Sequence, residues 1–468
     1  MIILPILLYK WKQELVPFMR VDFFTWNEIF QNIPERIIKR YKYYERKEEW
    51  ARYLSPPQTF AIYGMRHLMS LKFDSSLECL RLWGFIFNET ERLFRAKQIN
   101  KKIIAVMGDL GGIPPIIYSF KSLIGFYPDC LWWQPFFSEN YNLFEVTGKA
   151  SFPETSCYSR VIYATFLKKA YFPKPDLIIA STGASCDDYS CVMQKVYNLF
   201  YKDKKTEFIW LEIPPRKEKR ESAIKLLKEN YQRLAKILSE ITQEKFTIEK
   251  LISGIKRVNL IRRNYQRLKE LVGKSEIAPL GSLEMLLLEF GNLHFYSDIL
   301  EWQKILLGIL NLVRKRIKDN EGVLNKENKK IIWATPPADP LYLIYFEDNG
   351  TRIVGSEYII HQALEIIPIN KNKDPFTALA ESYLSASLIG KTKERAYLII
   401  NEVKKYQAKG VVISQVFGAS HCAYETEILK EEIEEKTKVP VLIIDIPLPS
   451  SEIPLQTKTR INAFIENL

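Results

Sequence analysis

Two stretches of this sequence of 468 residues alternate short apolar runs with helical patterns. The apolar runs are rich in Ile, Val and Leu, which is typical of strands that are buried on both faces. They comprise residues 102–107, 177–180 and 208–213 in the first stretch and residues 330–334, 410–414 and 441–445 in the second. The alternation predicts an α/β fold with two parallel sheets, each covered by helices on both sides.

Elsewhere the chain carries the spacing of three and four between apolar residues that is typical of helices. The stretches with this spacing include residues 26–53 and 77–94 before the first sheet and residues 223–241 and 248–271 between the two sheets. A chain of this length is too long for one hydrophobic core. We therefore expect four parts. They are an N-terminal helical extension at residues 1–100, a first α/β domain at 101–216, a helical connector at 217–328 and a second α/β domain at 329–468.

Charge and hydropathy exclude several classes of protein. The net charge is +12, but Lys and Arg are spread along the chain. A nucleic-acid reader would gather them on one face, so we expect no nucleic-acid partner and a better fit to a polyanionic small ligand such as coenzyme A. The apolar run at residues 1–9 is broken by Pro5 and is shorter than the ~20 residues that span a bilayer. No small-residue cleavage site follows it, so we expect a cytoplasmic protein without a membrane partner.

Three of the six cysteines share one kind of position. Cys186 follows an apolar run and a Gly/Ser turn and precedes a helical pattern. Cys157 stands at a helix start marked by Ser, Thr and Glu, and Cys422 stands between a predicted strand and a predicted helix. Open α/β sheets bind ligands at the carboxyl ends of their strands, and helix-start N–H groups favour the thiolate that binds metal.

If the two α/β halves face each other, these three thiols can converge. Three thiolates suit a [4Fe–4S] cluster whose fourth iron is free for a non-protein ligand. Zinc is the alternative metal, although structural zinc normally uses two close pairs of ligands, and a small buried thiol is the alternative without metal. Cys191 is an alternative ligand to Cys186, which we prefer because its turn position frees the Sγ atom from helix packing. Cys79 lies on an apolar helical pattern and is expected to be a core thiol.

Several motifs occur together from about residue 100 to the C-terminus. They are Pro-Glu-Thr-Ser-Cys-Tyr-Ser-Arg at 153–160, Pro-Asp-Leu-Ile-Ile-Ala-Ser at 175–181, Ser-Cys-Asp-Asp at 185–188, Ala-Pro-Leu-Gly at 278–281, Asp-Pro-Phe-Thr-Ala-Leu-Ala at 374–380, Gly-Val-Val-Ile-Ser-Gln at 410–415 and Leu-Gln-Thr-Lys-Thr-Arg-Ile-Asn-Ala-Phe-Ile at 455–465. In order and spacing they resemble the 2-hydroxyacyl-CoA dehydratase family, which also contains the catalytic subunits of ATP-dependent benzoyl-CoA reductase. The first 100 residues carry no such resemblance.

The resemblance implies two flavodoxin-like halves that hold one [4Fe–4S] cluster through Cys157, Cys186 and Cys422. It also implies a homologous second subunit, in a homodimer or heterodimer, and a separate iron–sulfur activator that hydrolyses ATP and injects one electron. The substrate would be an acyl-CoA thioester, reduced to a ketyl radical before water is eliminated or an aromatic ring is reduced. We therefore expect an iron–sulfur subunit of an acyl-CoA dehydratase or reductase. The alternatives are a non-catalytic electron-relay or scaffold subunit that carries the cluster, and a chain that keeps the fold without it.

Candidate catalytic residues adjoin Cys422 in the chain. Ser420 and His421 could hydrogen-bond a cluster sulfide or the substrate, although a solvent-facing loop residue is the simpler interpretation of His421. Arg160 is a candidate partner for a CoA phosphate, with a helix salt bridge as the alternative. The chain departs from the family pattern at residues 107–110, which carry no cysteine, and after Ala380, where the additional cysteines of double-cluster relatives are missing. A fused double cluster is therefore not expected.

Overall fold

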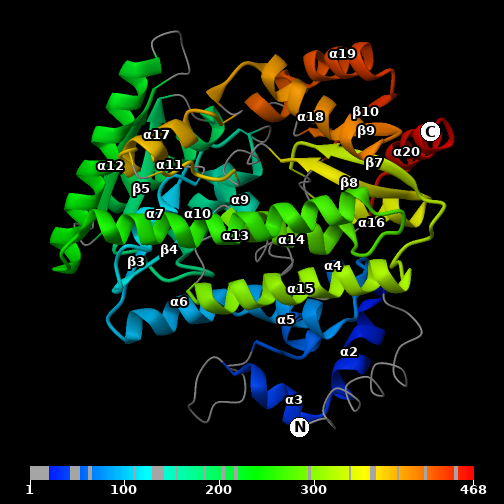
Figure 1. Ribbon diagram of the computed structural model, residues 1–468, viewed down its shortest axis with the longest axis horizontal. Coiled ribbons are helices and arrows are strands. Elements are labelled where there is room, and N and C mark those ends of the chain that lie inside the picture. Colours follow the sequence, from blue (N-terminus) through cyan, green and yellow to red (C-terminus); the bar gives the residue numbers. More distant parts are fainter. Residues whose placement is uncertain are drawn as a thin grey trace.

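The computed structural model describes residues 20–42, 53–61, 66–108, 111–128, 142–153, 156–183, 186–201, 206–214, 220–293, 297–336, 339–358, 365–370, 372–386, 389–415, 419–446 and 452–468. These residues form two four-stranded parallel sheets, a set of long helices that runs along both, and an N-terminal part that is mostly helical. Figure 1 shows the first sheet on the left and the second on the right, with the N-terminal part below. The predicted α/β class with two flavodoxin-like halves is confirmed.

The first sheet has the strand order β4-β3-β5-β6, and all its neighbouring strands are parallel. Its elements are β3 (Lys102–Met107), α7 (Pro114–Ile117), β4 (Leu123–Phe126), α9 (Asn142–Lys149), the 3-10 helix η4 (Tyr158–Arg160), α10 (Val161–Lys168), β5 (Leu177–Gly183), α11 (Asp187–Tyr201) and β6 (Glu207–Ile213). Side chains alternate between the faces of a strand. Ile103 and Ala105 accordingly share a core with α10 and α11, whereas Ile104 and Val106 share one with the long helices. This alternation explains why the apolar run of β3 needs a helical cover on both sides.

The second sheet repeats this plan with the order β10-β9-β7-β8, again parallel throughout. Its elements are β7 (Lys329–Ala334), α16 (Leu341–Asp348), β8 (Thr351–Glu357), α17 (Pro375–Tyr383), α18 (Thr392–Tyr406), β9 (Gly410–Gln415), the one-turn π-helix η7 (Ser420–Tyr424), α19 (Thr426–Thr437), β10 (Val441–Asp445) and α20 (Leu455–Glu466). Ile332 and Ala334 pack in a core with α18 and α19, and Ile331 and Trp333 pack on the opposite face. Both halves are therefore built by the same physical rule.

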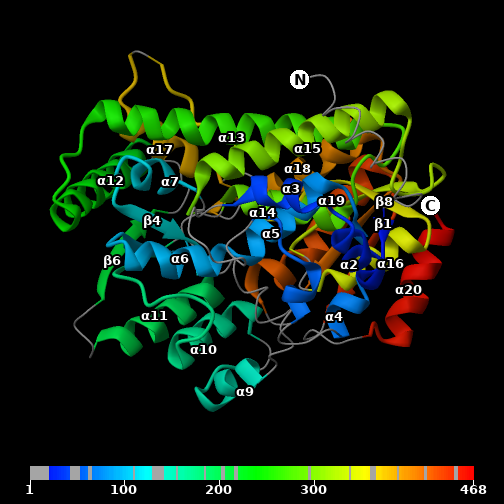
Figure 2. The same ribbon diagram turned by 90° about the horizontal axis from the view of Figure 1, so that it is seen from below.

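Four long helices join the halves: α12 (Arg220–Thr242), α13 (Ile248–Lys274), α14 (Ser282–Leu293) and α15 (Ile299–Asp319). α13 packs against α7 of the first half and against β8 of the second. In Figures 1 and 2, α13 and α15 lie side by side along the length of the molecule. A Cβ atom at Gly254 would collide with the carbonyl of Pro115, and one at Gly273 would collide with the ring of Tyr406. These two close approaches hold α13 against both halves and so fix one half relative to the other.

The N-terminal part contains the helices α2 (Phe23–Gln31), α3 (Glu35–Ile38), η1 (Lys39–Tyr41), η2 (Pro57–Ala61), α4 (Arg66–Met69), α5 (Leu77–Phe87) and α6 (Glu89–Gln98). It also contains an antiparallel pair, β1 (Arg20–Val21) with β2 (Phe73–Asp74), which no periodic pattern in the sequence predicts because each strand is so short. Trp26 stacks on Phe73 with their ring centroids 4.3 Å apart. Leu93 of α6 packs in the core of the first sheet, so α6 covers that sheet although it precedes residue 101. The four domain boundaries stay predictions.

None of the described helices combines the length and the apolar composition needed to cross a membrane. The apolar run at residues 1–9 lies outside the described residues.

Candidate functional site

The three cysteines that the sequence singles out all lie at helix starts. Cys157 directly precedes η4, Cys186 directly precedes α11, and Cys422 lies within η7, which leads into α19. β5 precedes Cys186 and β9 precedes Cys422, and both strands have neighbours on either side in their sheets. Cys186 and Cys422 therefore lie beyond the carboxyl ends of inner parallel strands, where open α/β sheets bind their ligands.

The three thiols are close enough to affect one another's charge. Burial raises the pKa of the Cys422 thiol well above its usual value, and the charges of Cys157 and Cys186 raise it further. Burial and the charge of Cys157 likewise raise the pKa of Cys186 to about 12. Burial also raises the pKa of Cys157. Three thiolates would repel one another here, so a positive centre between them would stabilise the charged forms.

The donor chemistry of these thiols bears on which metal group they could hold. Within the described parts of the chain, no three His, Cys, Asp or Glu side chains form a group that could hold a metal ion. Cysteine thiolates are ligands both of zinc and of iron–sulfur clusters, so the donor chemistry of the three side chains fits either group. The [4Fe–4S] cluster and the zinc alternative both stay predictions.

Two hydrogen bonds anchor the loop that carries Cys157. The backbone amide of Cys157 donates to Oδ1 of Asp188 in α11, at 3.3 Å. The hydroxyl of Tyr158 donates to the carbonyl of Ile446, which follows β10 of the second half. The first bond ties the Cys157 loop to the helix that Cys186 begins, and the second ties it to the other half. The loop is thus held from both sides of the boundary between the halves.

Comparison with known proteins adds to this geometry. Residues 126–468 match the family model described as 2-hydroxyglutaryl-CoA dehydratase, D-component. The chain belongs to this family. It is also similar to one of the subunits of benzoyl-CoA reductase from Thauera aromatica, with 22% identity over 327 residues that cover 63% of this chain and 70% of that protein. The resemblance found in the sequence is confirmed, and Cys157, Cys186 and Cys422 all lie within the matched region.

The other cysteines of this dehydratase-family chain differ in their surroundings. Cys79 is fully buried, and burial raises the pKa of its thiol well above the usual value, as expected for a core thiol. Cys191 is exposed within α11, whereas Cys186 precedes that helix, and Cys191 stays an untested alternative ligand. Cys130 lies outside the described residues.

Three further candidates from the sequence adjoin the cysteine loops. Ser420 and His421 belong to the π-helix η7, but their side chains lie outside the described residues. Arg160 is 3% exposed, donates to the carbonyl of Ser156 and lies over the ring of Phe144 at 5.2 Å from its centroid. Through these contacts Arg160 helps to shape the loop of Cys157. Its two predicted partners, a CoA phosphate and the acid of a helix salt bridge, stay predictions.

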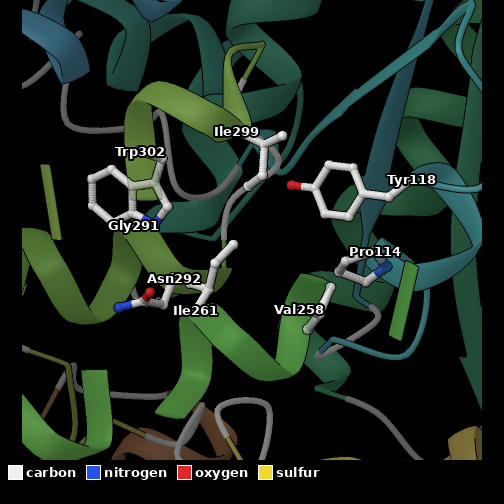
Figure 3. A pocket seen from close by; sticks show the side chains of 8 residues that line it. All are labelled: Pro114, Tyr118, Val258, Ile261, Gly291, Asn292, Ile299 and Trp302. Atoms are coloured by element: carbon white, nitrogen blue, oxygen red, sulfur yellow. The ribbon is translucent and has the colours of Figure 1, made fainter. Parts of the chain in front are cut away.

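An apolar recess lies between α7 of the first half and the helices α13, α14 and α15. Figure 3 shows the hydroxyl of Tyr118 pointing toward its centre. The recess is small, with a volume of about 10 Å³, which is roughly the room that one water molecule needs. Its lining is Pro114, Tyr118, Val258, Ile261, Gly291, Asn292, Ile299 and Trp302. This volume is far smaller than that of a small-molecule pocket, and none of the three cysteines lines the recess.

Sequence reasoning missed one buried residue of the site. Arg395 lies in the first turn of α18 and is 2% exposed. Its positive charge lowers the pKa of Cys422, opposing the burial and the two thiols that raise it. No motif surrounds Arg395 in the sequence, so only the folded chain reveals that it lies near Cys422.

Proposed function

We propose that this chain is the iron–sulfur subunit of an ATP-activated acyl-CoA dehydratase or reductase that applies one-electron, ketyl-radical chemistry to a CoA thioester. The observation that carries the proposal is the mutual influence of Cys157, Cys186 and Cys422, which come from both halves of a chain of this family. A purely structural role for the thiols would not require such convergence. Membership of the family supports the reaction class, and the cysteines support the cofactor.

In this proposal Cys157, Cys186 and Cys422 bind a [4Fe–4S] cluster as thiolates. The bound cluster would supply low-potential electrons and an open iron position for the thioester carbonyl. Asp188 and Tyr158 orient the Cys157 loop through their hydrogen bonds. The three cysteines are partly buried, which would limit the access of water and so protect a reactive radical from side reactions. Ser420 and His421 stay candidates for catalytic residues because they adjoin Cys422 in the chain.

The proposal includes two protein partners and one substrate class. The family is named for a component of an enzyme and the relative from Thauera aromatica for a subunit, which supports a homologous second subunit for this chain. An iron–sulfur activator that hydrolyses ATP would deliver the electron. A net charge of +12 suits an acyl-CoA substrate, whose CoA moiety carries several phosphate charges, and we place the assembly in the cytoplasm.

Iron analysis tests the cofactor directly. Protein purified without oxygen is expected to be brown and to contain about four irons per chain. Cys157→Ala, Cys186→Ala and Cys422→Ala are each expected to lose most of this iron. Cys79→Ala is the matched control, because it removes a buried thiol outside the site and should keep the iron. Colourless wild-type protein containing zinc would refute the proposal.

A second measurement separates a catalytic subunit from one that only relays electrons. The EPR spectrum of the reduced protein is recorded before and after addition of acyl-CoA thioesters. A catalytic subunit is expected to show a changed spectrum, because the thioester carbonyl would bind next to the unpaired electron. A spectrum that no acyl-CoA changes, in protein with its full iron content, would favour the relay or scaffold alternative.

A further inference from the structure

The guanidinium of Arg395 joins three segment ends beside the Cys422 turn. Its Nε atom donates to Oε2 of Glu357 at 2.8 Å, and its Nη2 atom donates to Oγ1 of Thr335 at 2.8 Å. Its Nη1 atom donates to Oε2 of Glu425 at 3.1 Å. Glu357 ends β8, Thr335 follows β7, and Glu425 joins η7 to α19. One side chain from α18 therefore holds the carboxyl ends of two strands and the end of the π-helix that contains Cys422.

The backbone at Thr335 and in η7 adopts uncommon conformations, which the hydrogen bonds of Arg395 help to stabilise. Thr335 has a φ of 68°, in the left-handed region that a β-branched residue rarely adopts. Its amide donates to the carbonyl of Glu357 at 2.7 Å, and its own carbonyl accepts from the hydroxyl of Ser414 at 3.0 Å. A π-helical turn such as η7 is itself uncommon and occurs often at functional sites. Arg395 thus lies where strained backbone meets the turn that carries Cys422.

We propose that Arg395 is a positioning residue for Cys422, which it holds through Glu425, and that its buried positive charge favours both binding and reduction of the metal group there. The inference rests on the proposed function, since it concerns the group that Cys422 would bind. It assigns a role to a residue on α18 that lies outside every cysteine loop.

The charges around Cys422 explain why a cation is needed. Glu357 is 1% exposed, so without Arg395 its buried carboxylate would lose this guanidinium and would lie near a thiolate. Glu425 would add a second, partly exposed negative charge at the end of the same turn. An unpaired buried charge is strongly unfavourable, and like charges disfavour the thiolate that a metal requires. Arginine suits the position because its planar fork can serve three acceptors at fixed angles, which lysine cannot do.

Two substitutions at this position separate geometry from charge. Arg395→Lys keeps the charge but loses the fork, and is expected to speed the release of iron to a chelator roughly tenfold. Arg395→Met loses both and is expected to release iron faster still. In Arg395→Met the midpoint potential of the bound metal group should also be lower than in the wild type, because a positive charge stabilises the reduced form. EPR-monitored redox titration without substrate or activator measures this potential. Arg395→Lys should keep a midpoint near that of the wild type.

The controls distinguish this role from ordinary stabilisation. Arg316→Met breaks another buried ion pair, with Asp74, and should lower stability without changing the midpoint or the iron release. If Arg395→Met does not fold, Glu357→Gln combined with Arg395→Met also removes the buried negative charge and allows the same measurements. Folded protein lacking Arg395 with the iron release and midpoint of the wild type would overturn the inference and leave the proposed function intact. Wild-type protein that binds no iron would overturn both.

Discussion

The buried carboxyl group of Glu284 lies where the N-terminal part meets the long helices. Its titration predicts the direction in which the free energy of unfolding changes with pH. Glu284 of α14 is 2% exposed and accepts hydrogen bonds from the amide of Asp74 at 3.1 Å and from the indole of Trp83 at 3.4 Å. The nearby cation, Arg316, forms its ion pair with Asp74. Burial, and then the charge of Asp74, raise the pKa of Glu284 to about 8.

The sign of the pH dependence follows from this shift. In the unfolded chain Glu284 titrates near its ordinary value of 4.5, whereas the folded protein keeps the proton up to a pH of about 8. The unfolded state therefore releases its proton first as the pH rises. The stability contributed by the protonated group is complete below the unfolded pKa and is lost between the two values. Since one pKa unit corresponds to about 1.4 kcal/mol, the loss reaches about 3 kcal/mol near pH 7.

Glu284→Gln tests this reasoning because the amide cannot ionise and keeps an oxygen acceptor for Asp74 and Trp83. The variant is expected to gain stability over the wild type as the pH rises, by about 3 kcal/mol between acidic and neutral pH. Urea titrations of metal-free protein, followed by tryptophan fluorescence at several pH values, measure the difference in free energy of unfolding. Glu431→Gln, at an exposed position of α19, is the matched control and should show no such trend. A difference between Glu284→Gln and wild type that does not change with pH would refute the argument.

Two further pairs of substitutions test the supports of the site and the fold. Asp188→Ala removes the acceptor of the Cys157 amide and is expected to speed iron release to a chelator roughly tenfold, whereas Asp187→Ala at the exposed neighbouring position should not. Equal release rates in the two variants would contradict a role for that hydrogen bond. Gly254→Ala forces a methyl group into the backbone of α7 and should lower the free energy of unfolding by ~1–3 kcal/mol in urea titrations. Gly148→Ala, whose methyl group meets no atom within 4 Å, should instead raise the free energy of unfolding by up to ~1 kcal/mol. A similar loss of stability in both variants would show that steric crowding does not explain the effect of Gly254→Ala.

Much of the fold could be predicted because buried parallel strands leave a strong local pattern. The apolar runs at 102–107 and 441–445 coincide with β3 and β10. Such strands are apolar on both faces, and turn residues bound them on either side. β4 escaped prediction because four residues at the edge of a sheet carry too little pattern, and β1 with β2 escaped because each has only two residues.

The candidate site was also predictable from the sequence only in part. Turn and helix-start residues around Cys157, Cys186 and Cys422 are local signals, so their positions before helices could be predicted. The burial of Arg395 could not be predicted, because an arginine in an amphipathic helix is ordinarily a solvated residue. Its contacts with Glu357 and Thr335 join segments that are distant in the chain, and no local pattern records them.

By itself, the sequence determined the two α/β halves, the family and the position of Cys157, Cys186 and Cys422 at or near a helix start. These properties depend on hydrophobic periodicity, turn chemistry and ordered motifs, which act over a few residues at a time. Only the tertiary structure decided that the thiols of Cys186 and Cys422 influence each other across the two halves and that a buried arginine lies beside one of them. Electrostatic interaction depends on distance in space, and that distance is set by how α13 and its neighbours hold the two sheets together.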